Sequence, residues 1–393
     1  MSTPAQTRRE AMNPNSVRSE GSTYSVGTGS RWLALAVLCL GVVMIILDTT
    51  IVNVALPSIR EALGFDETTL VWVVNAYMLT FGGFLLLSGR LGDLYGHRRI
   101  FLGGLALFTL ASLACGLAHS QAVLVAARAV QGLGGSAVSA ISLSLIMNLF
   151  PEPVERAKAM GFYSFVCAGG GSIGVLLGGV LIQNFDWHWI FLVNIPLGAA
   201  VYVLTLFLVP SSSATAGSRH LDLAGAITVT TALMLGVFGI VGGNQAGWLS
   251  MRTLGILGAA GALLLTFFVI ESKVSVPLLP LRFFRSRNFS TSNTIGVLWA
   301  AAMFAWFFLS ALYLQLVLER SAMEVGLAFL PSNLIMAACS LGLSARLVVR
   351  FGIRVPLSAG LAMAAVGLLL FVRAPVDGQI LSDVLPAMLL LVL

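Results

Sequence analysis

"IILDTTIVNVALP", residues 45–57, places one carboxylate, Asp48, in a segment that otherwise consists mainly of apolar residues. The apolar run around it extends from about residue 32 to residue 54, which is long enough to cross the roughly 30 Å hydrocarbon core of a bilayer as a helix. A charged side chain at the centre of such a helix costs about 2.5–3.5 kcal/mol on insertion scales. The stretch therefore predicts a membrane helix and a polar partner for Asp48 inside the bilayer.

The composition of the whole chain indicates the same environment. Of its 393 residues, 58% are hydrophobic and only 10% are charged, whereas soluble domains carry about 25% charged residues. Apolar stretches of about 17–25 residues, the length that spans a bilayer as a helix, recur along the sequence. We place them near residues 32–54, 70–88, 100–117, 121–147, 159–182, 189–209, 222–242, 253–270, 289–317, 325–344 and 356–372, with a twelfth that begins near 381. The sequence therefore predicts an all-α polytopic membrane protein.

Basic residues between these segments predict the orientation of the chain, because cytoplasmic loops are enriched in Lys and Arg. If the N-terminus is cytoplasmic, the inside loops hold Arg90, Arg98, Arg99, Arg156, Lys158, Arg219, Lys273, Arg282, Arg285, Arg287, Arg346, Arg350 and Arg354, and the outside loops hold Arg60, Arg252, Arg320 and Arg373. We therefore expect a multi-pass protein of the inner or plasma membrane with a cytoplasmic N-terminus. The same loops explain the net charge of +6 without a nucleic-acid partner.

A weak internal repeat divides the chain into two related halves. RLGDLYGHR (90–98) and RLVVRFGIR (346–354) share an Arg-Leu pair, an aromatic-Gly pair and a final Arg at an offset of 256. Duplicated halves around a central site are typical of transporters. We expect a disordered cytoplasmic tail (1–30), a six-helix N-terminal bundle (31–210), a linker with two inserted transmembrane helices (211–287) and a C-terminal bundle (288–393). The same offset maps residue 393 onto residue 137, inside the fourth span, so the C-terminal half is expected to be incomplete and the chain truncated.

Asp48 has one candidate partner at the same depth in the membrane. Span one runs outward and span four runs inward, so at 1.5 Å per residue Asp48 and Arg128 both lie about 10 Å below the outer surface. A buried ion pair can offset much of the cost of desolvating its two charges. Two interpretations remain open: the pair locks spans one and four together, or protonation of Asp48 frees Arg128 and couples proton flow to a conformational change.

A second motif, GRLGDLYGHRR (89–99), lies at a predicted cytoplasmic turn. Gly89 and Gly96 permit a tight reversal of the chain. Asp93 and Arg98 offer a charge pair or a contact with a helix end.

The fifth span carries a glycine motif. Gly170, Gly174 and Gly178 recur at every fourth residue, and Gly179 follows them. This spacing places a smooth stripe on one helix face and lets another backbone approach closely. The stripe serves either dense helix packing or a moving contact at a gate.

Other polar and aromatic residues within the spans are candidates for lining a transport cavity. They are Asn53, Asn75, Tyr77, Gln131, Asn293, Trp299, Phe304 and Gln315. A largely apolar, aromatic cavity with one carboxylate suits lipophilic cations. No sequence motif points to a metal site, a cofactor or an enzyme active site, and a monomer is expected.

Taken in order along the chain, these motifs resemble the major facilitator superfamily, and within it the fourteen-helix drug:proton antiporters. The similar segments are LDTTIVNVALP (47–57) in the first helix, GRLGDLYGHRR (89–99) in loop 2–3, ARAVQGLGG (127–135) in span four, GSIGVLLGG (171–179) in span five and WHWIFLVNIPLG (187–198) at the start of span six. The resemblance implies a major-facilitator-type fold with six N-terminal helices, two inserted helices and a second, incomplete half.

The resemblance also implies roles for individual residues. Asp48 and Arg128 would belong to a proton-coupling site, and the span-five glycines to an antiport hinge. The cytoplasmic gate motif would comprise Gly89, Arg90, Asp93, Gly96, Arg98 and Arg99. The chain departs from the family pattern at Val175, where the antiporter motif usually has proline, and at His188, which replaces a usual arginine.

These observations predict a proton-coupled antiporter that exports lipophilic or cationic drugs across the inner membrane by alternating access. Its partners would be protons, small lipophilic or cationic molecules and the lipid bilayer. Two alternatives remain open: an inactive membrane remnant or scaffold without transport, and an exporter of an endogenous metabolite or antibiotic.

Overall fold

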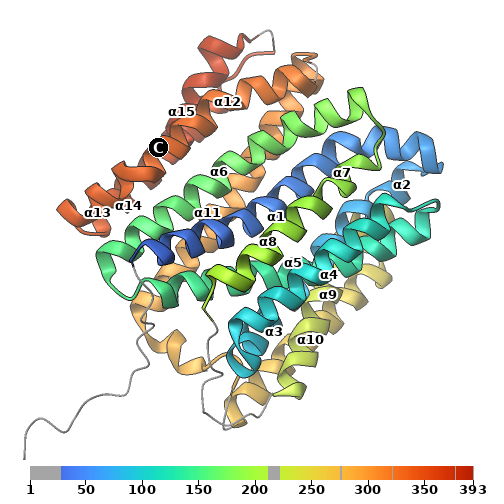
Figure 1. The fold of residues 1–393 in the computed structure, drawn as a ribbon. Helices are drawn as coiled ribbons and strands as arrows, with labels where there is room; N and C mark the ends of the chain where they lie inside the picture. Colours follow the sequence, from blue (N-terminus) through green and yellow to red (C-terminus); the bar gives the residue numbers. More distant parts are fainter. Residues whose placement is uncertain (1–27, 211–221, 275–276, 321, 377, 393) are drawn as a thin grey trace, which may run out of the picture.

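The computed structural model describes residues 28–210, 222–274, 277–320, 322–376 and 378–392 (Figure 1). Within these ranges the chain is helical without strands, and ten helices are long and apolar enough to cross a membrane. The predicted all-α polytopic fold is confirmed. The tail expected at 1–30 lies outside the described residues as far as residue 27, and residues 28–30 form the first turn of α1 instead.

The N-terminal half is a bundle of long helices joined by short turns (Figure 1). Two short helices, α2 and α7, lie where the chain enters α3 and α8. The bounds are α1 Thr28–Leu63, α2 Glu67–Leu70, α3 Trp72–Tyr95, α4 His97–Gly116, α5 Gln121–Leu149, α6 Pro153–Asn184, α7 Trp189–Leu192 and α8 Asn194–Leu208. Polar caps determine several starts: the Ser120 hydroxyl accepts a hydrogen bond from the Val123 backbone nitrogen at the start of α5, as N-cap residues do.

Helix α5 packs against both α3 and α4, and its glycines let these two neighbours approach closely. A Cβ atom on Gly134 would lie 2.5 Å from the Phe108 backbone nitrogen and 2.7 Å from the Gly104 carbonyl oxygen, both on α4. A Cβ on Gly132 would meet the Tyr77 carbonyl of α3. Since lipid provides no hydrophobic force between helices, small residues that permit close van der Waals packing hold such bundles together.

The two inserted helices, α9 Leu223–Ala246 and α10 Met251–Lys273, form a hairpin that packs against α3. Asp222 caps α9 by accepting a hydrogen bond of 2.8 Å from the Gly225 nitrogen. The Trp72 ring lies 5.6 Å from the Phe238 ring, and a Cβ on Gly83 would lie 3.0 Å from Met234 Cγ. The hairpin is therefore attached to the N-terminal bundle through α3.

The second half contacts the first through α6. Its elements are η1 Leu281–Arg285, α11 Arg287–Leu312, η2 Tyr313–Val317, α12 Ala322–Ala338, η3 Cys339–Leu343, α13 Ser344–Phe351, α14 Arg354–Phe371, η4 Ile380–Val384 and α15 Leu385–Val392. Helix α12 and the π turn η3 pack on α6, where a Cβ on Gly161 would lie 2.5 Å from the Ser340 carbonyl oxygen. The span expected at 325–344 lies in a helical run interrupted by η3, and it is not among the ten membrane-length helices.

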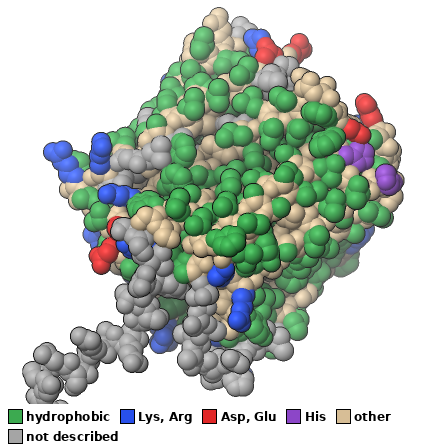
Figure 2. Space-filling model, viewed as in Figure 1, with side chains coloured by type: hydrophobic (Ala, Val, Ile, Leu, Met, Phe, Trp, Pro, Cys, Tyr) green, Lys and Arg blue, Asp and Glu red, His purple; other side chains and the backbone are tan. Residues whose placement is uncertain are grey.

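The surface agrees with a membrane environment. Figure 2 shows hydrophobic side chains spread across the middle of one face, while most charged side chains and the histidines lie at its margins. Exposed apolar side chains of this kind are covered by lipid in a membrane protein.

The contact between α4 and α5 gives the first prediction. Gly134→Ala is expected to destabilise the protein by about 1–3 kcal/mol, because the added methyl group meets backbone atoms that cannot rotate away. The midpoint of thermal unfolding of the purified protein in detergent measures the effect. Gly103→Ala on α4 is the matched control, since no atom lies within 4 Å of the position of its Cβ. Equal midpoints for the two variants would contradict this packing.

Candidate functional site

The structure brings Asp48 of α1 and Arg128 of α5 into direct contact. Arg128 Nη1 lies 2.6 Å from Asp48 Oδ2, and the two side chains are 0% and 1% exposed. The second carboxylate oxygen, Oδ1, accepts hydrogen bonds from Gln131 Nε2 at 2.8 Å and from Asn194 Nδ2 at 3.2 Å. Both oxygens of a fully buried acid are thus satisfied, as the cost of burying a charge requires.

The Arg128 guanidinium has further partners besides the carboxylate. Its Nε donates to the Val73 carbonyl of α3 at 2.9 Å, and its Nη1 also donates to Gln131 Oε1 at 2.7 Å. The Tyr77 ring lies 4.4 Å below the guanidinium carbon, close enough for a cation–π interaction. Three neutral groups therefore hold the arginine in addition to its acid.

Two residues of this network were not among the predicted site residues. Asn194 begins α8, and its Nδ2 also lies 3.0 Å from Ser112 Oγ of α4. Ser112 in turn donates to the Phe191 carbonyl at 2.9 Å. Asn194 lies within the segment WHWIFLVNIPLG, near the start of span six, so its depth is similar to that of Asp48, but depth alone does not show which way its side chain faces. Ser112 gives no such signal, because serine is common in membrane helices, where it permits close packing and hydrogen bonds between helices.

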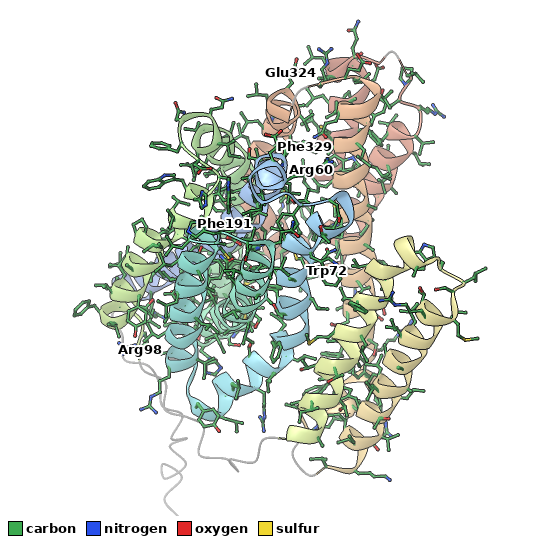
Figure 3. All side chains as sticks on the ribbon, turned by 90° about the vertical axis from the view of Figure 1, so that its right-hand side faces the viewer. Arg60, Trp72, Arg98, Phe191, Glu324 and Phe329 are labelled. Carbon is green, nitrogen blue, oxygen red and sulfur yellow. The ribbon has the colours of Figure 1, made fainter. Side chains whose placement is uncertain are left out.

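The gate motif lies at the opposite end of the bundle from Phe191 (Figure 3). Asp93 Oδ1 lies 3.2 Å from His97 Nε2, and Asp93 Oδ2 lies 3.9 Å from Arg90 Nη1. Arg98 does not contact Asp93 in these ion pairs but donates to the Leu206 carbonyl near the end of α8. The charge pair and the helix-end contact that the sequence offered as alternatives are both present, with different partners.

One expectation for this motif was wrong. Gly89 lies inside α3, which continues to Tyr95, so it forms no part of a reversal. The chain turns at Gly96, whose φ of 96° is open to glycine but strained for other residues. Helix α3 is therefore longer than the predicted span, 70–88, by about two turns at its C-terminal end.

The glycine stripe formed by Gly170, Gly174 and Gly178 of α6 faces α1 and not the second half. A Cβ on Gly174 would meet Thr50, and a Cβ on Gly178 would lie 3.4 Å from the Ile51 Cα. These contacts lie on the same stretch of α1 that carries the buried carboxylate. The stripe thus joins the helix of the charged network to the helix that contacts the second half.

The predicted cavity-lining residues separate into two groups. Tyr77 and Gln131 are buried and belong to the charged network. Asn75 is half-buried, and the exposed members are Asn53, Asn293, Trp299, Phe304 and Gln315. The amides of Asn53 and Asn293 donate to carbonyls of their own helices. The structure therefore does not bring this second group to Asp48.

Comparison with known proteins places the chain in a family. A family model described as "Major Facilitator Superfamily" matches residues 38–393. Multidrug resistance protein Stp of Mycobacterium tuberculosis (strain CDC 1551 / Oshkosh) is 39% identical over 343 residues, which cover 87% of this chain and 64% of Stp. The cephamycin export protein CmcT of Amycolatopsis lactamdurans is 38% identical, covering 88% of this chain and 71% of CmcT. The lincomycin resistance protein of Streptomyces lincolnensis is 37% identical, covering 98% of this chain and 79% of the relative.

Solved structures share the fold at low sequence identity. The proton:xylose symporter XylE superimposes with a TM-score of 0.62 at 17% identity, covering 93% of this chain and 79% of XylE. The human organic anion transporter MFSD10 superimposes with a TM-score of 0.60 at 16% identity, covering 92% of this chain and 84% of MFSD10. The chain spans just under two thirds of the length of Stp, at 64%.

The buried pair gives the second prediction. Arg128→Gln leaves Asp48 buried without its counter-charge, which is expected to cost about 3–5 kcal/mol of stability. Adding Asp48→Asn to this variant removes the uncompensated charge and should restore much of the loss. Thermal unfolding midpoints of the two variants and the wild type in detergent measure both effects.

The matched control for this prediction is Arg31→Gln. Arg31 lies 3.3 Å from Glu155 in a pair whose side chains are 21% and 33% exposed, so its loss should cost at most about 1 kcal/mol. A double variant as unstable as Arg128→Gln alone would contradict the role of charge compensation at Asp48.

Proposed function

This chain belongs to the major facilitator superfamily, and we propose that it exports lipophilic or cationic small molecules in exchange for protons. The family assignment and the ten membrane-length helices among the described residues support a multi-pass membrane transporter. The names of its relatives, which include a multidrug resistance protein and a cephamycin export protein, support drugs as the cargo. We place the protein in the cell membrane with its N-terminus in the cytoplasm, in keeping with its basic loops.

The observation that carries proton coupling is the fully buried ion pair of Asp48 and Arg128, 2.6 Å apart. Intramembrane carboxylates serve as proton relays in many transporters. A proton that binds an Asp48 oxygen converts the ion pair into a neutral acid beside a cation. Arg128 then keeps Val73, Gln131 and the Tyr77 ring as partners, so the arginine stays on α5 and α3 while its hold on α1 weakens.

The packing of α1 offers a route from this site to the second half. Helix α1 contacts α6 along the glycine stripe, and α6 contacts η3 at Gly161 and Ser340. A shift of α1 after protonation is transmitted to α6 because the two helices lie close together at Gly174, which meets the Thr50 side chain, and at Gly178, which faces the Ile51 backbone. In this proposal α6 is the element that changes its contact with the second half during alternating access.

Antibiotic export is the second candidate for the cargo. The cephamycin and lincomycin relatives are named for antibiotics, whereas Stp is named for multidrug resistance. Both kinds of cargo would use the same proposed coupling site. Measuring transport of a lipophilic cation and of an antibiotic distinguishes the two candidates.

The third prediction concerns proton coupling. Asp48→Asn keeps the size of the side chain but replaces one acceptor oxygen with an amide NH2 group, and the amide cannot take up a proton. In inverted membrane vesicles, uptake of ethidium and of lincomycin driven by an imposed pH gradient is expected for the wild type and is expected to be lost in the variant. Binding of either compound to purified protein should remain.

Asp186→Asn is the control, because Asp186 is an exposed acid that pairs with His188 at 2.8 Å near the α6–α7 turn. It should transport at the wild-type rate. Gradient-driven uptake by Asp48→Asn equal to that of the wild type would reject the relay role, and a wild type that moves neither compound would reject drug export.

The fourth prediction concerns the contact between α1 and α6. Gly174→Ala introduces a methyl group that meets Thr50, an overpacking that typically costs about 1–3 kcal/mol, and should slow gradient-driven uptake per amount of folded protein. Gly171→Ala on the same helix is the control, since no atom lies within 4 Å of its Cβ position. Equal uptake by the two variants would contradict transmission through this contact.

A further inference from the structure

A cavity of about 400 Å³ lies between the start of α3 and the inserted hairpin of α9 and α10. It is separate from the charged network and is lined by Trp72 of α3, Phe238, Gly239 and Gly242 of α9, and Arg252 and Ile256 of α10, among others. Its volume falls within the range of about 300–1,000 Å³ that is usual for small-ligand sites. Figure 3 shows Trp72 near the top of α3, beside the hairpin.

The walls of this cavity combine aromatic and aliphatic side chains with the polar side chains of Arg252 and Thr253, and part of the space is open because of a glycine. The Trp72 and Phe238 rings lie 5.6 Å apart and form one side. No atom lies within 4 Å of the position that a Cβ on Gly242 would take, so the cavity continues to the α9 backbone there. Such a space fits an alkyl chain better than a polar solute.

The rim of the cavity carries a positive charge. No carboxylate among the described side chains lies within ion-pair distance of Arg252, the second residue of α10. A larger cavity of about 640 Å³ in the second half differs in this respect, because Arg320 on its rim lies 3.5 Å from Glu324, which also lines it. The hairpin cavity therefore has a net positive charge, and it favours an anionic ligand.

The surroundings of Arg252 place this charge at the surface of the bilayer. Leu249 and Met251 are 88% and 87% exposed, as apolar side chains are when lipid covers them. Trp248 lies against Gly243 in the same turn, 3.2 Å from the position of a Cβ there. Tryptophan and arginine near helix ends are typical of the interfacial zone, where lipid phosphates lie.

We propose that this cavity binds one anionic phospholipid from the leaflet that surrounds the α9–α10 turn, with its phosphate on Arg252 and an acyl chain between Trp72, Phe238 and Gly242. The Arg252 guanidinium donates charge-assisted hydrogen bonds to the phosphate oxygens. The acyl chain fills the space between α3 and α9. The lipid thereby joins the inserted hairpin to the N-terminal bundle, a role independent of the transport proposed above.

The fifth prediction tests this site with two variants of the whole chain. Native mass spectrometry of the purified protein, titrated with phosphatidylglycerol or phosphatidylcholine, measures retained lipid. The wild type should retain one phosphatidylglycerol with at least about tenfold preference over phosphatidylcholine. Arg252→Gln should lower the phosphatidylglycerol affinity about tenfold, since a charge-assisted contact is lost. Gly242→Leu should abolish retention of that lipid, because the new side chain fills the cavity.

Two controls match these variants. Arg320→Gln removes the arginine on the rim of the larger cavity in the second half, where Glu324 already balances its charge. Gly258→Leu adds a leucine at an exposed position of α10, with no atom within 4 Å of the Cβ position. Both should retain phosphatidylglycerol like the wild type. Unchanged retention by Arg252→Gln or by Gly242→Leu would overturn the proposal. Displacement of the lipid by glycerol 3-phosphate at equal concentration would also overturn it, because a soluble anion would then suffice.

Discussion

The buried carboxylate of Asp48 needs hydrogen-bond and ion-pair partners, and this need constrains how the helices of the N-terminal half pack together. Asp48 is fully buried, and a buried charge persists only when it is paired and hydrogen-bonded. Its two oxygens take partners from α5 and α8, and those partners take theirs from α3 and α4. Five helices therefore meet at this point, and each of them must be placed accurately for the carboxylate to keep these partners.

Close helix packing is what makes such a network possible. The Val73 carbonyl of α3 and the Ser112 hydroxyl of α4 reach Arg128 and Gln131 where glycines on α5 bring the backbones of α3 and α4 close to α5. Glycines also permit close contact between α1 and α6 on the other side of the carboxylate, at Gly174 and Gly178. Polar contacts and small residues thus work together, as expected where lipid supplies no force between helices. A proton on Asp48 would weaken the polar part of this arrangement and leave the packing contacts in place.

The sequence predicted the features of this structure that depend only on position along the chain or on depth in the membrane. Hydropathy identified most spans, and equal depth in the membrane selected Arg128 as the partner of Asp48 (2.6 Å away). Partners that depend on how helices rotate about their axes could not be predicted. Asn194 and the Val73 carbonyl belong to this class, and so does the choice of Leu206 over Asp93 as the acceptor for Arg98. Gly89 was misplaced for a different reason, since glycine permits a turn but a long apolar helix does not require one.

The first turn of α3 connects the two sites of this protein. The Val73 carbonyl accepts a hydrogen bond from Arg128, and the neighbouring residue, Trp72, forms a wall of the cavity next to the inserted hairpin. Adjacent residues on a helix point in different directions, so this one turn faces the charged network on one side and the hairpin on the other. The inserted hairpin and the charged network are therefore neighbours of the same turn of α3, on different sides of it.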